Sequence, residues 1–173
     1  MNKPTIQLVD SFLQEHASLF ETLRDSVTWD DRMAARRTAS FGQPYNYSQI
    51  DYSATPMLPE LKDVASKLES QLNVAFNNCL LNFYETGDNS MGFHSDDTSG
   101  LISGTGVAIV SLGSARDITF RNIADKSIQH SFSLLPGALL YMDDAVQALW
   151  MHAIKKQANA GPRISLTWRA FRP

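Results

Sequence analysis

The chain has a single cysteine, Cys79, among its 173 residues. One thiol cannot form an intramolecular disulfide, and it cannot supply the ligands of a cysteine-based zinc site. Cys79 lies in the sequence Asn78-Cys79-Leu80-Leu81, which is typical of a small residue in a hydrophobic core. Stability must therefore come from buried apolar side chains.

Long apolar runs are also missing. No segment approaches the roughly 18 apolar residues of a membrane-spanning helix. The first ten residues contain one lysine and no continuous apolar stretch, so they lack the core of a secretory signal. We expect a soluble, intracellular protein, cytoplasmic in a bacterium, with no membrane partner.

The chain has no excess of positive charge. Its 15 Lys and Arg residues against 18 Asp and Glu give a formal net charge of -3. This argues against a large basic surface for nucleic acid, although a compact local patch is compatible with it. With 43% hydrophobic residues, the length is enough for one sizeable core and short for two. We expect a single domain spanning residues 1–173, and a monomer.

Two amphipathic helices are predicted in the first half of the chain. Ser11-Phe12-Leu13-Gln14 has the form of a capping box, and apolar residues follow at helical spacing, so a first helix is expected over about residues 11–25. A second is expected to begin at Pro59, a favoured residue in the first turn of a helix. Both are predicted to pack on a sheet.

The rest of the chain has the character of a β protein. Residues 29–57 are aromatic and irregular, with glycine and proline, which indicates short strands and turns. From residue 78 onward, seven short runs are predicted as strands: 79–84, 106–112, 117–121, 128–134, 138–142, 150–154 and 164–171. This pattern predicts a mainly β fold with flanking helices, built as a barrel or a double-sheet jelly roll.

His94 and Asp96 stand two apart, so on an extended strand both side chains could reach one ion. Two imidazoles and one carboxylate, with positions left open, form the ligand set of non-haem Fe(II) oxygenases. His152, inside the apolar run 150–154, is a candidate third ligand, but a histidine in such a run is more often a hydrogen-bonded core residue. His130 competes for the role, and residue type does not decide between them.

The segment from Arg163 to Arg169 alternates polar and apolar side chains. Arg163, Ser165, Thr167 and Arg169 are predicted on one face, and Ile164, Leu166 and Trp168 on the other. Arginines persist in an enclosed site only when paired, and their planar fork suits carboxylates. A dicarboxylate co-substrate would supply that partner; the alternative is a solvated strand face. Asn82 and Tyr84, also same-face neighbours, could add an amide and a phenol.

This ordered set resembles the AlkB-like family of Fe(II)- and 2-oxoglutarate-dependent dioxygenases. The resemblance rests on Asn82-Phe83-Tyr84, His94-Ser95-Asp96, His152 and the segment from Arg163 to Arg169. It extends upstream through Arg37-Thr38-Ala39-Ser40-Phe41-Gly42 and Tyr45-Asn46-Tyr47-Ser48, which are similar to the family's nucleotide-recognition lid. It covers about residues 36–173.

The resemblance implies a double-stranded β-helix over residues 78–173 and a lid over 29–57, and the helix expected from the apolar spacing makes residues 1–28 an N-terminal helical segment. It implies that His94, Asp96 and His152 bind Fe(II). It also implies that Arg163 and Tyr84 bind the distal carboxylate of 2-oxoglutarate. The resemblance places Asn82 and Arg169 around the rest of the co-substrate, with Ser165 where the family usually has Asn, and makes His130 structural.

The activity that the resemblance implies is oxidative demethylation of N-methylated bases of the 1-methyladenine or 3-methylcytosine type, in DNA or RNA. Dioxygen and 2-oxoglutarate are consumed, and formaldehyde, succinate and carbon dioxide are released. In the lid, Arg32, Arg36 and Arg37 are candidates to contact phosphates and Tyr45 or Tyr47 to stack on the base. Asp97 could accept a hydrogen bond from a base edge. The net charge favours a single-stranded substrate.

Two other functions remain open from the sequence. The same chemistry could act on a small metabolite or a protein side chain, which the acidic charge and Ser165 favour. The chain could also be a non-catalytic jelly roll that keeps these polar residues without turnover. Binding of metal and 2-oxoglutarate separates the last possibility from the others.

Overall fold

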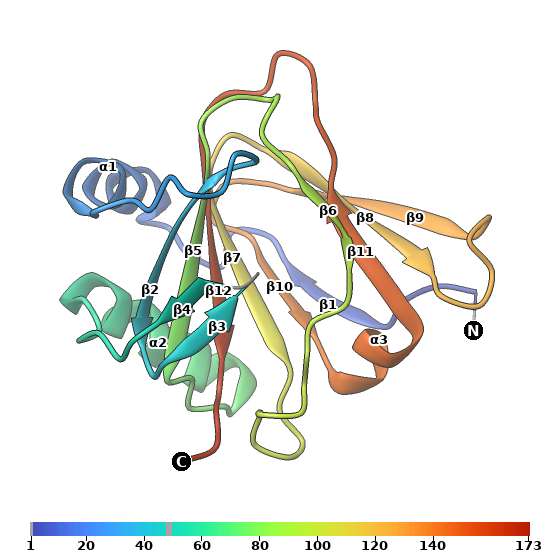
Figure 1. Cartoon of the computed structure of the whole chain (residues 1–173), viewed down its shortest axis with the longest axis horizontal. Helices are drawn as coiled ribbons and strands as arrows, with labels where there is room; N and C mark the ends of the chain where they lie inside the picture. Colours follow the sequence, from blue (N-terminus) through green and yellow to red (C-terminus); the bar gives the residue numbers. More distant parts are fainter. Residues whose placement is uncertain (1, 48–49) are drawn as a thin grey trace.

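The computed structural model describes residues 2–47 and 50–173, so Ser48 of the predicted lid lies outside the described residues. Two antiparallel sheets face each other (Figure 1). The six-stranded sheet has the order β1-β10-β7-β12-β5-β2, and the four-stranded sheet has the order β6-β11-β8-β9. The strands of the larger sheet are β1 (Ile6–Val9), β10 (Leu139–Met142), β7 (Val107–Gly113), β12 (Arg163–Arg169), β5 (Asn78–Tyr84) and β2 (Arg37–Gly42). Those of the smaller sheet are β6 (Met91–His94), β11 (Trp150–Ile154), β8 (Arg116–Asn122) and β9 (Gln129–Leu134).

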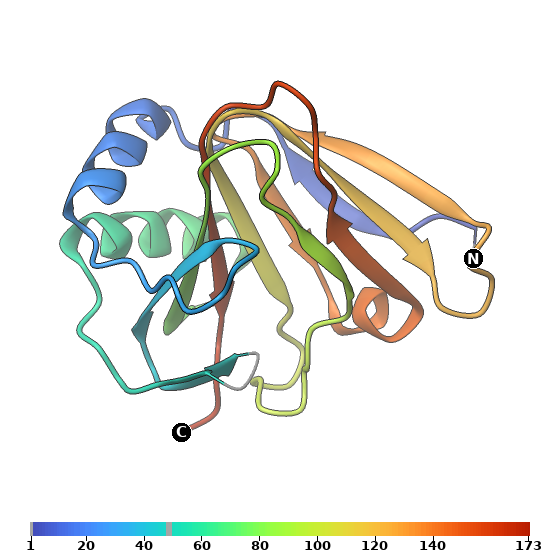
Figure 2. The ribbon, with the colours of Figure 1, turned by 45° about the horizontal axis from the view of Figure 1, so that its top comes forward.

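Helices cover one face of the larger sheet. Helices α1 (His16–Ser26) and α2 (Pro59–Leu72) lie on the side away from the smaller sheet (Figure 2). Their buried leucines join the apolar face of β12 in one core, which contains Leu23, Leu61, Leu68, Leu166 and Trp168. A second core fills the space between the two sheets and includes Phe120, Leu140 and Trp150. Alternate residues of a central strand therefore face different cores: in β7, Val110 and Leu112 belong to the first core, and Val107 belongs to the second.

A small hairpin of β3 (Tyr45–Tyr47) and β4 (Ile50–Tyr52) stands apart from both sheets. It occupies the part of the chain predicted as a lid. Its position beside the open end of the facing sheets is visible in Figure 1. The side chain of Tyr47 lies outside the described residues.

Most predicted elements are confirmed, and the differences have local causes. The seven predicted strands correspond to β5 and β7–β12, each within two residues of the expected bounds. The predicted capping box is wrong: Ser11 has φ 57°, a left-handed turn conformation, and α1 begins only at His16. Strands β1 and β6 and the six-residue helix α3 (Asp144–Leu149) were not predicted, because runs of four to six residues carry little periodicity. Within the described residues, no helix has both the length and the apolar character needed to cross a membrane.

Candidate metal centre

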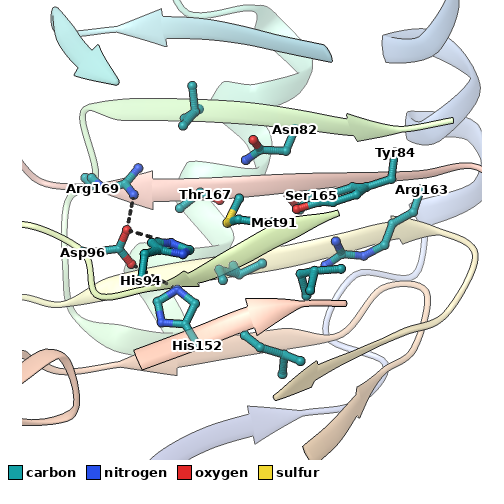
Figure 3. Close-up of a pocket in the computed structure, with 14 residues that line it drawn as sticks. Asn82, Tyr84, Met91, His94, Asp96, His152, Arg163, Ser165, Thr167 and Arg169 are labelled. Atoms are coloured by element: carbon teal, nitrogen blue, oxygen red, sulfur yellow. Dashed lines mark hydrogen bonds and ion pairs between the residues drawn. The ribbon is translucent and has the colours of Figure 1, made fainter. Parts of the chain in front are cut away.

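Three predicted ligands meet at one end of the space between the sheets (Figure 3). His94 ends β6, and His152 lies directly opposite on β11, where the two are paired in register. Asp96 follows in the loop after β6, so His94 and Asp96 do not share one extended strand, and the strand ends at His94. His94, Asp96 and His152 each offer a ligand atom, and these atoms all lie within 4.8 Å of one another. One ion can therefore contact all three.

Hydrogen bonds around the cluster orient its ligands. The ring Nδ1 of His94 lies 2.8 Å from the carbonyl oxygen of Gly92. A carbonyl only accepts, so Nδ1 carries the proton and Nε2 keeps a lone pair directed at the cluster. The backbone N–H of Asp96 donates to Oε1 of Gln147 at 2.8 Å, and the hydroxyl of Ser95 donates to the carbonyl of Trp150 at 2.9 Å. Sequence reasoning missed Gln147, because it lies on the unpredicted helix α3.

The charge state of the cluster suits a divalent metal. Burial alone would raise the pKa of Asp96, but Arg169, His152 and His94 together outweigh it, and the pKa is lowered. Arg169 Nη2 donates to Asp96 Oδ1 at 2.8 Å, which leaves the other carboxylate oxygen 3.5 Å from His152 Nε2. Burial lowers the pKa of His152 to about 4, so its imidazole is neutral at pH 7. An ionised carboxylate at Asp96 and a neutral imidazole at His152 are the forms in which these two side chains bind Fe(II).

A pocket extends from the cluster along the polar face of β12 (Figure 3). The predicted alternation is confirmed, since Arg163, Ser165, Thr167 and Arg169 all line this pocket. Its full lining is Leu80, Asn82, Tyr84, Met91, His94, Asp96, Ile109, Ile118, His152, Ile154, Arg163, Ser165, Thr167 and Arg169. The pocket thus unites every residue expected to bind metal or co-substrate.

Arg163 is the group in this pocket that most clearly indicates an anionic ligand. Its side chain is fully buried, and burial lowers its pKa to about 10. Nε and Nη2 both donate to the hydroxyl of Ser111, at 2.9 and 2.7 Å, and Nη1 has no hydrogen-bond partner within the described residues. A buried cation with no carboxylate partner among the described residues is costly, and a carboxylate ligand would offset that cost.

The remaining predicted co-substrate residues surround this arginine. Tyr84 is paired in register with Arg163, and its ring centre lies 5.2 Å from the guanidinium carbon. Asn82 is paired with Ser165 two residues along the same two strands. The donors therefore extend in a row from Arg163 toward the metal cluster, which fits a short linear dicarboxylate. Ser111 was not predicted, because a lone serine in an apolar strand carries no distinguishing pattern.

The predicted substrate contacts lie outside the pocket lining. Tyr45 covers Arg169, with the guanidinium carbon 4.6 Å from its ring centre, and packs against Phe171 at 5.4 Å. Arg37 is half-exposed and pairs with Glu85 at 3.4 Å. Asp97 is exposed and accepts a hydrogen bond from the backbone of Ser99 at 2.9 Å. Of the predicted contacts whose side chains the structure describes, Tyr45 is the one that packs directly against a residue of the site.

The structure also shows the surroundings of three other candidate residues, Arg36, Arg32 and His130. The prediction that Arg36 contacts phosphate is wrong, because its side chain is buried and donates to Asn82 at 2.8 Å. Arg32 forms an ion pair with Asp30. His130 is outside the metal cluster: its ring packs against Trp150 at 5.9 Å, and its Nε2 lies at the carbonyl of Asn2. A structural role for His130 agrees with these contacts.

The two facing antiparallel sheets form a jelly roll. Between them lie a His-Asp-His cluster and a pocket lined by arginines, which together define a metalloprotein of the oxygenase type. The comparison with family models gives the particular family. The model described as 2OG-Fe(II) oxygenase superfamily matches residues 7–169. The chain belongs to this superfamily, whose cofactors are Fe(II), 2-oxoglutarate and dioxygen.

Individual relatives agree with this membership. Alpha-ketoglutarate-dependent dioxygenase alkB homolog 3 of Mus musculus is 30% identical over 181 residues, which are 93% of this chain and 63% of that protein. DNA oxidative demethylase ALKBH2 of Bos taurus is 31% identical over 150 residues, 80% of this chain and 54% of that protein. Uncharacterized protein R406 of Acanthamoeba polyphaga mimivirus is 32% identical over 155 residues, 86% of this chain and 80% of that protein. The chain thus spans less than two thirds of the two mammalian relatives. The predicted resemblance to AlkB-like proteins is confirmed.

The fold is confirmed independently by a solved structure. That of OsALKBH1 superposes with a TM-score of 0.68 and covers 96% of this chain and 98% of that chain, at 17% identity. At this identity the likeness supports the jelly-roll fold alone. The residues of the metal cluster and pocket fit the cofactors of the family through their donor set and through the buried Arg163.

Proposed function

We propose that this chain is an Fe(II)- and 2-oxoglutarate-dependent dioxygenase that removes N-methyl groups from bases of single-stranded DNA or RNA. The observation that carries the proposal is the convergence of His94, Asp96 and His152 beside the buried cation of Arg163. The names of the relatives, which include a DNA oxidative demethylase, support a methylated base as the substrate. We propose a single catalytic domain in which residues 29–57 form the lid.

In this proposal His94, Asp96 and His152 hold the iron. Arg163 and Tyr84 bind the distal carboxylate of 2-oxoglutarate. The rest of the molecule is surrounded by Asn82, Ser165 and Arg169. Bound iron supplies the oxidation of the N-methyl group by dioxygen, coupled to conversion of 2-oxoglutarate to succinate and carbon dioxide. The protein orients the reactants and keeps water from the buried pocket.

The substrate is assigned to the open side of the pocket, where Tyr45 covers Arg169. A target base must leave the stack to reach the metal, and single-stranded nucleic acid allows this at low cost. Arg37 is half-exposed and can exchange Glu85 for a phosphate. Asp97 is exposed beside the metal ligand Asp96 and has a carboxylate available to a base edge. Tyr47 stays a candidate for stacking.

The test uses single-stranded DNA and RNA oligonucleotides that carry 1-methyladenine or 3-methylcytosine. We expect loss of one methyl group by mass spectrometry, with equal amounts of formaldehyde and succinate. His94→Ala should abolish turnover and Fe(II) binding. His130→Ala is the matched control, because this histidine lies outside the metal cluster, and it should retain both.

Other outcomes identify the other functions. Oxidation of 2-oxoglutarate with no oligonucleotide consumed would replace the nucleic acid with a small metabolite or a protein side chain. Failure to bind Fe(II) or Mn(II), with no thermal stabilisation by 2-oxoglutarate, would make the chain a non-catalytic jelly roll.

A further inference from the structure

The side chain of Arg36 is buried at a junction between the lid, the co-substrate pocket and the metal-binding strand. Its Nε donates to Oδ1 of Asn82 at 2.8 Å, and its Nη1 donates to the carbonyl of Ser90 at 3.0 Å. Asn82 lines the pocket, and Ser90 directly precedes β6, which ends at His94. Arg36 itself directly precedes β2. One guanidinium thus connects three parts of the site.

The backbone beside Arg36 is braced to the same loop. The carbonyl of Ala35 accepts from the backbone N–H of Ser90 at 3.2 Å and from Nδ2 of Asn89 at 3.0 Å. On the other side, Arg37 and Thr38 are paired in register with Phe83 and Asn82. Arg36 is therefore held at both ends, and its guanidinium is fixed relative to the Asn82 amide.

The chemistry of a guanidinium decides which way the amide points. An arginine side chain carries only donors, whereas an asparagine amide offers an acceptor oxygen on one side and two N–H donors on the other. Because Arg36 engages the oxygen, the amide NH₂ must face the other way. Asn82 projects from β5 onto the pocket wall (Figure 3). A reversed amide would present a carbonyl oxygen to the pocket, and that oxygen would repel an anionic ligand.

We propose that Arg36 is a positioning residue that fixes the Asn82 amide with its NH₂ group directed at bound 2-oxoglutarate. The inference rests on the proposed co-substrate role of the pocket. Arg36 makes no contact with the co-substrate and acts only through Asn82. The sequence grouped Arg36 with the exposed arginines that could contact phosphate. In the structure its side chain is buried and points to the co-substrate pocket wall at Asn82 instead.

The test measures 2-oxoglutarate binding by calorimetry with Mn(II) in place of Fe(II), so that no turnover occurs. Arg36→Met should weaken 2-oxoglutarate roughly tenfold, the worth of about one hydrogen bond. Arg36→Lys keeps a cationic donor and should retain most of the affinity. Mn(II) affinity without 2-oxoglutarate should be unchanged in both variants, whereas a general collapse of the site would lower it.

A double-mutant cycle separates action through Asn82 from a structural effect. Once Asn82→Ala has removed the amide, adding Arg36→Met should cause little further loss of 2-oxoglutarate affinity. An equal loss in both backgrounds, or no loss in the wild-type background, would overturn the proposal.

A second variant leaves Arg36 intact in case its replacement prevents folding. Asn82→Asp keeps a partner for Arg36 but presents an oxygen to the pocket, so it should bind 2-oxoglutarate more weakly than Asn82→Ala. Wild-type affinity in Asn82→Asp would also overturn the proposal. If the wild-type protein binds no 2-oxoglutarate, the proposed function fails; if it binds and these variants do not differ, only the role of Arg36 fails.

Discussion

Replacing Arg163 with methionine should have opposite effects on stability and on co-substrate binding. The guanidinium is fully buried, and its Nε and Nη2 both donate to the hydroxyl of Ser111. Burying a charge costs several kcal/mol, and replacing buried charged groups by apolar side chains of similar volume is often neutral or stabilising, by up to about 4 kcal/mol. For a chain of this length each kcal/mol raises the melting temperature by roughly 2–4 °C. Arg163→Met should therefore melt several degrees higher than the wild type when no ligand is present.

Binding should change in the other direction. Removing one partner of a buried, hydrogen-bonded ion pair costs about 2–5 kcal/mol, so 2-oxoglutarate affinity should fall between roughly 30-fold and several thousand-fold. Differential scanning fluorimetry with Mn(II), with and without 2-oxoglutarate, measures both effects. The stabilisation by 2-oxoglutarate that is expected in the wild type should disappear in the variant.

Arg116→Met is the matched control, because Arg116 is also fully buried but donates to backbone carbonyls from its terminal nitrogens, which leaves only its Nε without a partner among the described residues. It donates to Asn89 at 2.8 Å and to Lys155 at 2.7 Å. Its loss leaves these acceptors unpaired and should lower stability, at about 1–3 kcal/mol for each. If Arg163→Met destabilises the ligand-free protein as Arg116→Met does and leaves 2-oxoglutarate affinity unchanged, the assignment of Arg163 to a carboxylate is refuted.

The other predictions concern the metal cluster and the lid. Burial lowers the pKa of His152 from its ordinary 6.5 to about 4. Between these two pH values the unfolded chain binds more protons than the metal-free folded protein. The free energy of unfolding should therefore fall as the pH drops from 6.5 toward 4. His152→Gln should reduce this slope in urea titrations at a series of pH values, and an unchanged slope would contradict the cause. Asp96→Asn should abolish Mn(II) binding in calorimetry. Asp97→Asn is the control and should retain Mn(II) binding, because the Asp97 side chain accepts a hydrogen bond from the backbone N–H of Ser99 instead. Equal losses of affinity in the two variants would contradict the assignment of Asp96 as the carboxylate ligand. Tyr45→Ala should raise the KM for a methylated oligonucleotide by roughly 5- to 150-fold if the ring contributes a base stack of about 1–3 kcal/mol, and an unchanged KM would remove Tyr45 from base recognition.

Local periodicity was sufficient to predict the parts of the site that lie on regular strands. In β12 the two-residue alternation alone predicts that the two arginines and the two apolar residues Leu166 and Trp168 lie on opposite faces. In the structure Arg163 and Arg169 line the pocket, whereas Leu166 and Trp168 lie in the core beneath the helices. The start of α2 at Pro59 was predicted for a similar reason, because the first turn of a helix needs no donor from proline. These features depend on neighbours within a few residues along the chain.

Features that depend on distant neighbours could not be predicted. Arg36 and Arg37 are adjacent and alike in sequence, yet one is buried against Asn82 and the other is half-exposed beside Glu85. Alternation along a strand says that two neighbours differ, but not which of them faces inward. Gln147 and Ser111 orient the metal ligand and the arginine through contacts 51 and 52 residues away along the chain. No pattern in one sequence identifies such partners.

The position of β12 in the larger sheet has a consequence for how the protein folds. This strand inserts between β5 and β7, and it pairs with both along nearly its whole length. Pairings between such distant segments form slowly, because the chain must close long loops before they contribute. Until residues 163–169 are in place, the larger sheet is divided and the pocket lacks the side chains of Arg163, Ser165, Thr167 and Arg169. Cofactor binding is therefore acquired in the same step that completes the fold, so no partly folded form should bind 2-oxoglutarate.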